Sequence, residues 1–253
     1  AGGTGAGTGA GAGMGANKEL SPKQYYEVWM RVFDELRHLT SIIQDAEKRG
    51  DVTMVALYER VQRCGGVIPR LYLMITAGAT FAASSDAPAK EILRDMLEMC
   101  KGVQHPTRGL FLRYFLSQLT RDKLHLLGDS SRERCEYVLS NFAEMTRVWV
   151  RMAHLAEVAV PGGSGGGGGG GGRALKDPET REAERRQLRQ LVGGCVVRLA
   201  EEADLPTYQS FVLPRVLEIV AGCNDAYVQT YLAHIMTQVV PAEFHLETLE
   251  EFL

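Results

Sequence analysis

The sequence lacks the cysteine pattern of a disulfide-bonded or zinc-binding protein. Its five cysteines include no CxxC pair, and an odd number without paired spacing argues against a disulfide framework. Each cysteine lies in an apolar helical pattern, where a free thiol behaves as a small core hydrophobe. Since the sequence also contains no Asn-x-Ser/Thr sequon and no signal peptide, it favours a cytosolic protein.

An excess of one charge and a long apolar run are also missing. The net charge is −3, from 28 basic and 31 acidic residues, so no global basic field attracts nucleic acid or acidic lipid. The uncharged apolar run over residues 71–83 is 13 residues long. A membrane-spanning helix needs about 20 residues. A buried core helix is therefore predicted there, and no transmembrane span.

Recognisable catalytic and metal-binding motifs are absent. The six histidines form no HExxH motif and do not pair with cysteine at zinc spacing. There is no GxSxG elbow, and no glycine tract is followed by Gly-Lys-Ser/Thr. We therefore expect no catalytic residue, no metal and no cofactor, and a helical hydrolase or metal enzyme is the disfavoured alternative.

Two glycine-rich tracts divide the chain. Residues 1–16 and 161–172 contain 8 and 10 of the 28 glycines, and neither tract has side chains to bury. The predicted organisation is a disordered segment over 1–20, helices over 21–160, a flexible loop over 161–173 and further helices over 174–253. Because the sequence stops at "ETLEEFL", inside a helical pattern, we interpret it as a fragment of a longer protein.

The remaining residues follow helical periodicity. Ser21, Pro22 and Gln24 have the spacing of a capping box, and Gly50 is expected to end the helix that they begin. The inward face of this helix is predicted to consist of Tyr26, Met30, Phe33, Leu36 and Ile43. In the clearest amphipathic helix, the inward positions are Cys135, Val138, Leu139, Phe142, Met145, Val148, Trp149 and Met152.

The succession of helices indicates an all-α fold. Eight or more helices, mostly of 12–25 residues, are joined by tight turns, and no segment shows convincing strand alternation. Each helix has one apolar face and a partner next in sequence. Antiparallel pairs stacked in order make an α-solenoid. This pattern favours the solenoid over a compact bundle, which remains the alternative.

A stripe of arginines follows the second glycine tract. Arg181, Arg185 and Arg189 are spaced at four residues, which would suit contact with phosphate or an acidic partner. Glutamates alternate with them, and Glu182 and Arg186 have the spacing of a helix-stabilising pair. We interpret the stripe as a solvated helix face.

The stretch "GGVIPRLYLMITAGATF" places a proline and an arginine in an apolar window. Pro69 fits if a helix begins near Val67, because a first-turn proline loses no helical hydrogen bond. The Arg70 guanidinium would then reach a carboxylate or carbonyl, inside the solenoid or across an interface. Pro214 and Arg215 repeat the arrangement, so the residues alone favour a structural role for Arg70.

At "IPRLYLMI" and "EMCKGVQHPTRGLFLRYFL" the sequence closely resembles the large α-solenoid subunit of retromer, in the vacuolar protein sorting-associated family. Matching blocks, among them "LYERVQRCGGVIPRLYL" and "NFAEMTRVWVRM", cover nearly all of 20–253. The resemblance implies a HEAT-repeat-like solenoid, expected to be a right-handed superhelix, of which this chain is the N-terminal portion. The C-terminal half of the family, which clasps a small metallophosphoesterase-fold subunit, lies outside the sequence.

The resemblance also implies a protein-binding site and a function. In the family, a Pro-Arg-Leu-Tyr-Leu motif docks the arrestin-like subunit. The matching residues here, followed by Met74, are Pro69, Arg70, Leu71, Tyr72 and Leu73. Sorting nexins and a late-endosomal Rab GTPase are further implied partners. The implied function is a non-enzymatic coat scaffold, peripheral on endosomes, that retrieves transmembrane cargo to the Golgi or plasma membrane. The alternative is the large subunit of a related retriever-type complex.

Overall fold

The computed structural model describes residues 20–84, 87–154 and 177–249, and these residues are helical without any strand. The predicted disordered segment, apart from Leu20, and the predicted loop over 161–173 lie outside the described residues. The α-helices are α1 (Pro22–Arg49), α2 (Met54–Gln62), α3 (Val67–Ala82), α4 (Ala89–Cys100), α5 (Pro106–Leu119), α6 (Ser131–His154), α7 (Pro178–Glu202), α8 (Leu205–Thr207), α9 (Leu213–Ala221), α10 (Ala226–Val239) and α11 (Ala242–Glu247). A 3-10 helix, η1 (Arg121–Leu127), follows α5, and a π-helix, η3 (Tyr208–Val212), joins α8 to α9.

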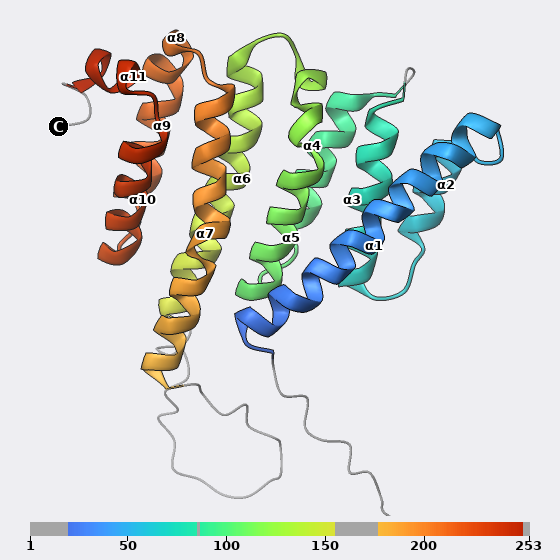
Figure 1. Cartoon of the computed structure of the whole chain (residues 1–253), viewed down its shortest axis with the longest axis horizontal. Helices are drawn as coiled ribbons and strands as arrows, with labels where there is room; N and C mark the ends of the chain where they lie inside the picture. The colour runs from blue at the N-terminus through green and yellow to red at the C-terminus, as the bar shows by residue number, and fades with distance from the viewer. Residues whose placement is uncertain (1–19, 85–86, 155–176, 250–253) are drawn as a thin grey trace, which may run out of the picture.

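The helices after α1 stack side by side in chain order (Figure 1). In one row α3 packs against α5, α5 against α7 and α7 against α10, while α6 packs against α9 in the other row. Successive helices such as α2 and α3, α5 and α6, and α6 and α7 also pack together, so each pair covers its neighbour. This arrangement confirms the predicted all-α solenoid of stacked helices. Its superhelical hand remains a prediction.

Helix α1 departs from the stack, because it runs obliquely past α5 and α3 (Figure 1), and it also contacts α7. Its start and end are as predicted: Ser21 and Gln24 form a capping box, and Gly50 ends it with a φ of 76°. Its buried residues recur every seven positions, about 10 Å along the helix axis, which is close to the spacing of packed helices. They are Pro22, Trp29, Leu36 and Ile43. A narrow stripe of this kind suits a helix that crosses a row.

The predicted inward face of α1 was therefore partly wrong. Tyr26 and Met30 are 46% and 36% exposed, whereas Trp29, which the periodicity did not select, is only 5% exposed. The Trp29 ring contacts Phe111 and Tyr114 of α5, with centroids 5.7 and 5.5 Å apart. Which stripe of α1 is buried depends on the helices that it crosses, and the sequence of α1 alone does not contain that information.

The core of the stack was predicted correctly. All eight inward positions named for the amphipathic helix α6 are buried. In α4 the buried residues are Ile92, Leu93, Met96, Leu97 and Cys100. The five cysteines are free; Cys64 is half-buried and the other four lie in the core. Burial raises the pKa of the Cys100 and Cys195 thiols to about 12, so both remain protonated packing residues at neutral pH.

Candidate functional site

The first turn of α3 has the geometry that its sequence predicts. Gly66 precedes the helix with a φ of 77°, a conformation that glycine adopts without strain, and the helix begins at Val67. Pro69 is the third helical residue, where a missing N–H removes no intrahelical hydrogen bond. Arg70 donates the first backbone bond of the helix, to the Gly66 carbonyl at 3.2 Å. The proline therefore begins α3 without a kink.

Three of the six candidate docking residues face the core and not the surface. Leu71, Tyr72 and Met74 are each 6–7% exposed. The Tyr72 ring packs on Phe115 of α5 with centroids 4.9 Å apart, and burial raises the pKa of its hydroxyl well above the usual range. Pro69 is exposed, and Arg70 and Leu73 are half-buried. Only Pro69, Arg70 and Leu73 thus present much surface to another protein.

Arg70 has no partner within the described part of the chain. Its guanidinium forms no hydrogen bond, ion pair or ring contact with any of residues 20–84, 87–154 or 177–249. The side chain is only half-buried, so water reaches it and its charge carries no full desolvation penalty. The sequence left open whether the partner of Arg70 lies inside the solenoid or across an interface. Among the described residues, no carboxylate or carbonyl inside the solenoid binds the guanidinium.

The second Pro-Arg pair lies in a different environment. Residues 205–221 form one continuous helix, in which Pro214 follows the π-helical turn η3. In a π turn the backbone hydrogen bonds join residues five positions apart and not four. The turn directly precedes Pro214, which has no backbone N–H to donate. The Arg215 guanidinium is 2.5 Å from the Glu218 carboxylate, and the side chain is 58% exposed. Arg215 is therefore paired within its own helix, whereas Arg70 is not.

The arginine stripe on α7 is only partly the solvated face that we expected. Arg185 is 5% exposed and forms ion pairs with Asp225, the N-cap of α10, and with Glu182 at 3.1 Å. Its guanidinium also lies over the ring of Tyr227, 5.1 Å from the centroid. Arg189 remains exposed. The middle of the stripe is thus an internal clamp between α7 and α10.

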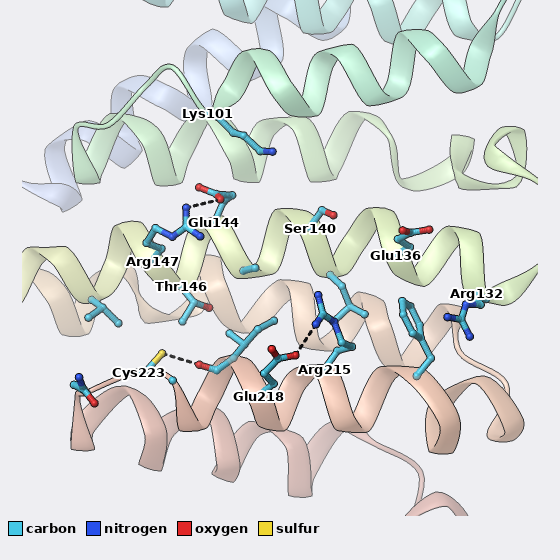
Figure 2. A pocket seen from close by; sticks show the side chains of 17 residues that line it. Lys101, Arg132, Glu136, Ser140, Glu144, Thr146, Arg147, Arg215, Glu218 and Cys223 are labelled. Atoms are coloured by element: carbon cyan, nitrogen blue, oxygen red, sulfur yellow. Dashed lines mark hydrogen bonds and ion pairs between the residues drawn. The ribbon is translucent and has the colours of Figure 1, made fainter.

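A groove of about 970 Å³ lies between α6 and α9 and opens toward the turn after α4 (Figure 2). Lys101 comes from that turn, Ser140 and Arg147 from α6, and Arg215 and Glu218 from α9. Apolar side chains line it between these polar groups: Leu139, Ala143, Val150, Phe211 and Ile219. The groove is therefore a mixed surface with an apolar floor and charged walls.

Glu144 connects the groove to a buried cation. Its carboxylate is 2.8 Å from Arg147 on the groove wall and 4.0 Å from Arg113 of α5, which is fully buried (Figure 2 shows the pair with Arg147). Burial lowers the pKa of the Arg113 guanidinium, and the neighbouring Glu144 charge opposes that shift. An uncompensated buried cation is costly, so Glu144 is needed by Arg113. It consequently neutralises Arg147 only in part.

The opposite end of the groove presents an arginine held on a ring. The Arg132 guanidinium lies 4.3 Å from the centroid of Phe211, and Arg132 is exposed. Among the described residues it forms no ion pair, although Glu136 stands one turn further along α6. Stacking on the ring fixes the plane of the guanidinium and leaves its donors free. Sequence reasoning missed this groove, because its walls are more than 60 residues apart in the chain.

The described residues contain neither a metal-binding cluster nor a membrane-spanning helix. In residues 20–84, 87–154 and 177–249, no group of three or more His, Cys, Asp or Glu side chains is placed to hold a metal ion. Over the same residues, every helix is too short or too polar to span a bilayer. The two candidate sites described above are the start of α3 and the groove between α6 and α9.

Comparison with known proteins places the chain in a family. The family "Vacuolar protein sorting-associated protein 35" matches residues 16–253. Vacuolar protein sorting-associated protein 35 of Dictyostelium discoideum is 45% identical over 242 residues, which are 92% of this chain and 28% of the relative. Protein 35A of Arabidopsis thaliana is 43% identical over 244 residues, 93% of this chain and 29% of the relative.

A fungal relative is similar over the same part of the chain, and the matched relatives are all much longer than this chain. The protein 35 of Schizosaccharomyces pombe is 37% identical over 246 residues, again 93% of this chain. The chain spans less than a third of the length of these relatives, from 27% to 29%. The all-helical stack and the α3 motif are consistent with this match, which covers nearly the whole sequence. The chain belongs to the Vps35 family of vacuolar protein sorting-associated proteins.

Proposed function

We propose that this chain is the N-terminal portion of a retromer large subunit, a non-enzymatic scaffold whose α3 region docks the arrestin-like subunit. Family membership supports this function over that of a retriever-type subunit. In the assembled coat, the scaffold serves retrieval of transmembrane cargo from endosomes to the Golgi or plasma membrane. Sorting nexins, a late-endosomal Rab GTPase and the small metallophosphoesterase-fold subunit complete the proposed set of partners.

The unpaired Arg70 guanidinium carries this proposal. It stands at the start of a packed helix, half-buried and without a partner on the described residues. Pro69 and Leu73 lie beside it and give the patch an apolar part. A guanidinium of this kind can bind a carboxylate of a partner through two parallel hydrogen bonds. Leu71, Tyr72 and Met74 act by holding α3 in place, because they face the core.

The test compares two charge reversals in the same chain. Arg70→Glu should weaken binding of the purified arrestin-like subunit by about 2–5 kcal/mol, a loss of roughly 30-fold or more. Arg215→Glu makes the same change in the other Pro-Arg pair and should leave binding unchanged. Isothermal titration calorimetry gives the affinities, and circular dichroism checks that both variants keep their helicity. Equal weakening by both variants would contradict the assignment of the site to α3.

A further inference from the structure

We propose that the groove between α6 and α9 binds an extended acidic peptide segment of another protein, with carboxylates near both ends of the segment and apolar side chains between them. None of residues 69–74 lines this groove, so the proposal is independent of the α3 site. The argument depends on the two arginines at its ends, on the hydroxyl and apolar groups between them, and on the balance of charge.

Arg132 forms the first end of the proposed site. Its guanidinium is stacked over Phe211 at 4.3 Å from the ring centroid and has no acidic partner among the residues that the structure describes. The ring removes much of the rotational freedom of this side chain, so little more is lost when a ligand binds. A carboxylate in the groove would meet two parallel N–H donors there.

Arg147 and Lys101 form the second end, on opposite sides of the groove opening (Figure 2). Arg147 is 65% exposed and is paired with Glu144, which also compensates the buried Arg113. When a ligand carboxylate takes Arg147, Glu144 keeps Arg113 as its partner and is not left uncompensated. A ligand carboxylate can therefore replace Glu144 as the partner of Arg147 without leaving the Glu144 carboxylate uncompensated.

The spacing of the two ends sets the length of the ligand. Arg132 and Arg147 are 15 residues apart on α6, which corresponds to about 22 Å at 1.5 Å per helical residue. An extended chain rises about 3.3 Å per residue, so about seven residues bridge the two arginines. A peptide of this length would lie along α6, parallel to the helix axis.

The groups between the two ends suit the middle of such a peptide. Leu139, Ala143 and Ile219 offer apolar contacts. The hydroxyl of Thr146 is buried in the same wall and has no hydrogen-bond partner on the described residues. A buried hydroxyl without a partner is unfavourable, so a backbone carbonyl of the ligand would satisfy it.

The charges of the groove select an acidic ligand over a basic one. Four cations line it: Lys101, Arg132, Arg147 and Arg215. Three glutamates also line it, but Glu218 is paired with Arg215, and Glu144 shares its charge with Arg113 in the core. Only Glu136 would be free to attract a basic side chain. Lys101 is paired with Glu98 at 2.5 Å. The excess positive charge therefore lies on Arg132 at one end and, because Glu144 is shared with Arg113, on Arg147 at the other.

The binding experiment uses two matched peptide probes with the 253-residue chain. The acidic probe is fluorescein-labelled Glu-Glu-Leu-Ala-Phe-Glu-Glu, and the basic probe replaces each Glu with Lys. Fluorescence anisotropy should give a Kd below about 100 µM for the acidic probe, and a value at least about tenfold higher for the basic probe. No binding of the acidic probe up to about 1 mM, or equal binding of both probes, would overturn the proposal.

Variants locate the bound probe. Arg132→Glu and Arg147→Glu should each weaken binding of the acidic probe at least about tenfold. Arg186→Glu, on the exposed side of α7, changes the charge equally and should have no effect, as should Arg70→Glu. Ala143→Trp should block the groove without a change of charge. If it fails to fold, the two arginine variants still decide, and equal loss with Arg186→Glu would refute the site.

Discussion

The two Pro-Arg pairs of this chain lie in similar apolar sequences and have opposite surroundings. Pro69 and Arg70 begin α3 after a glycine turn, and Arg70 has no partner on the residues that the structure describes. Pro214 and Arg215 lie within one continuous helix, and Arg215 is paired with Glu218. A short motif therefore does not identify a binding site. What matters is whether the protein satisfies the arginine internally.

The contrast extends to the helices around each pair. Near α9 and α10, arginines are held by acids of the same chain: Arg185 by Asp225 and Glu182, and Arg215 by Glu218. Near the start of α3, the packing is instead apolar and aromatic, as in the contact between Tyr72 and Phe115. The first region is stabilised by internal charge pairs. In the second region, Arg70 has no acidic partner among the described residues and can bind one on another protein.

The largest expected effect is on the internally paired region. Asp225→Asn removes the carboxylate that pairs with buried Arg185, but keeps the side-chain oxygen that accepts from the Val228 N–H at 3.0 Å. Leaving a buried cation with one acid fewer should lower the free energy of unfolding by about 3 kcal/mol. Urea denaturation followed by circular dichroism at pH 7 measures the loss. A loss below about 0.5 kcal/mol would show that Glu182 compensates Arg185 alone.

Acid should remove the same difference. Burial alone raises the pKa of Asp225, but the hydrogen bond and charge of Arg185, together with the Val228 N–H, outweigh it and hold the pKa below its usual 3.8. A carboxylate with a lowered folded-state pKa adds stability above its unfolded pKa, and that stability disappears as pH falls through the folded value. The gap between the parent and Asp225→Asn should thus be constant above about pH 5 and shrink below about pH 4. A gap that persists at pH 2 would argue against an ionic origin.

Leucine truncations should affect both regions alike. Leu71 and Leu213 are 7% and 0% exposed, so Leu71→Ala and Leu213→Ala should each lower the free energy of unfolding by about 2–4 kcal/mol. Leu73→Ala, at a half-buried position, should lower it by less than either. The same urea titrations compare all three variants. If Leu71→Ala left stability intact and only weakened partner binding, Leu71 would belong to the docking surface and not to the core.

Much of the fold could be predicted from the sequence because its signals are local. The capping box at Ser21 and Gln24 and the apolar periodicity of α6 involve residues within a few turns of one another. The six residues of the candidate α3 site were also placed correctly on one helix, because Gly66 and Pro69 define its start.

The remainder depended on contacts between distant segments. Trp29 is buried and Tyr26 exposed because α1 crosses the row of helices, a direction that its own periodicity does not encode. Arg185 is buried because Asp225, 40 residues away, caps α10 beside it. The groove brings Arg132 against Phe211 across 79 residues. No pattern within a single helix contains these pairings.

Proline replacements should have opposite effects in the two regions. Pro214→Ala restores a backbone N–H inside a continuous helix, where proline is about 3 kcal/mol less favourable than alanine. Since the π turn already accommodates the proline, we expect a gain in stability of about 1 kcal/mol. Pro69→Ala removes no folded-state contact that the helix needs, but it raises the conformational entropy of the unfolded chain. It should therefore lower the free energy of unfolding by about 0.4–1 kcal/mol. Thermal denaturation shows the two signs, and a loss in both variants would mean that the π turn requires Pro214.

The smallest effect concerns the arginines themselves. The pair of Arg215 and Glu218 is exposed on both sides, and such pairs contribute about 0.5 kcal/mol or less. Arg215→Ala should therefore lower stability slightly in 20 mM salt and not at all in 1 M salt. Arg70→Ala breaks no pair among the residues that the structure describes and should leave stability unchanged in both. Because Arg70→Ala should still weaken binding of the arrestin-like subunit, the pair of variants separates folding from docking. A stability loss in Arg70→Ala as large as that in Arg215→Ala would assign Arg70 to the fold.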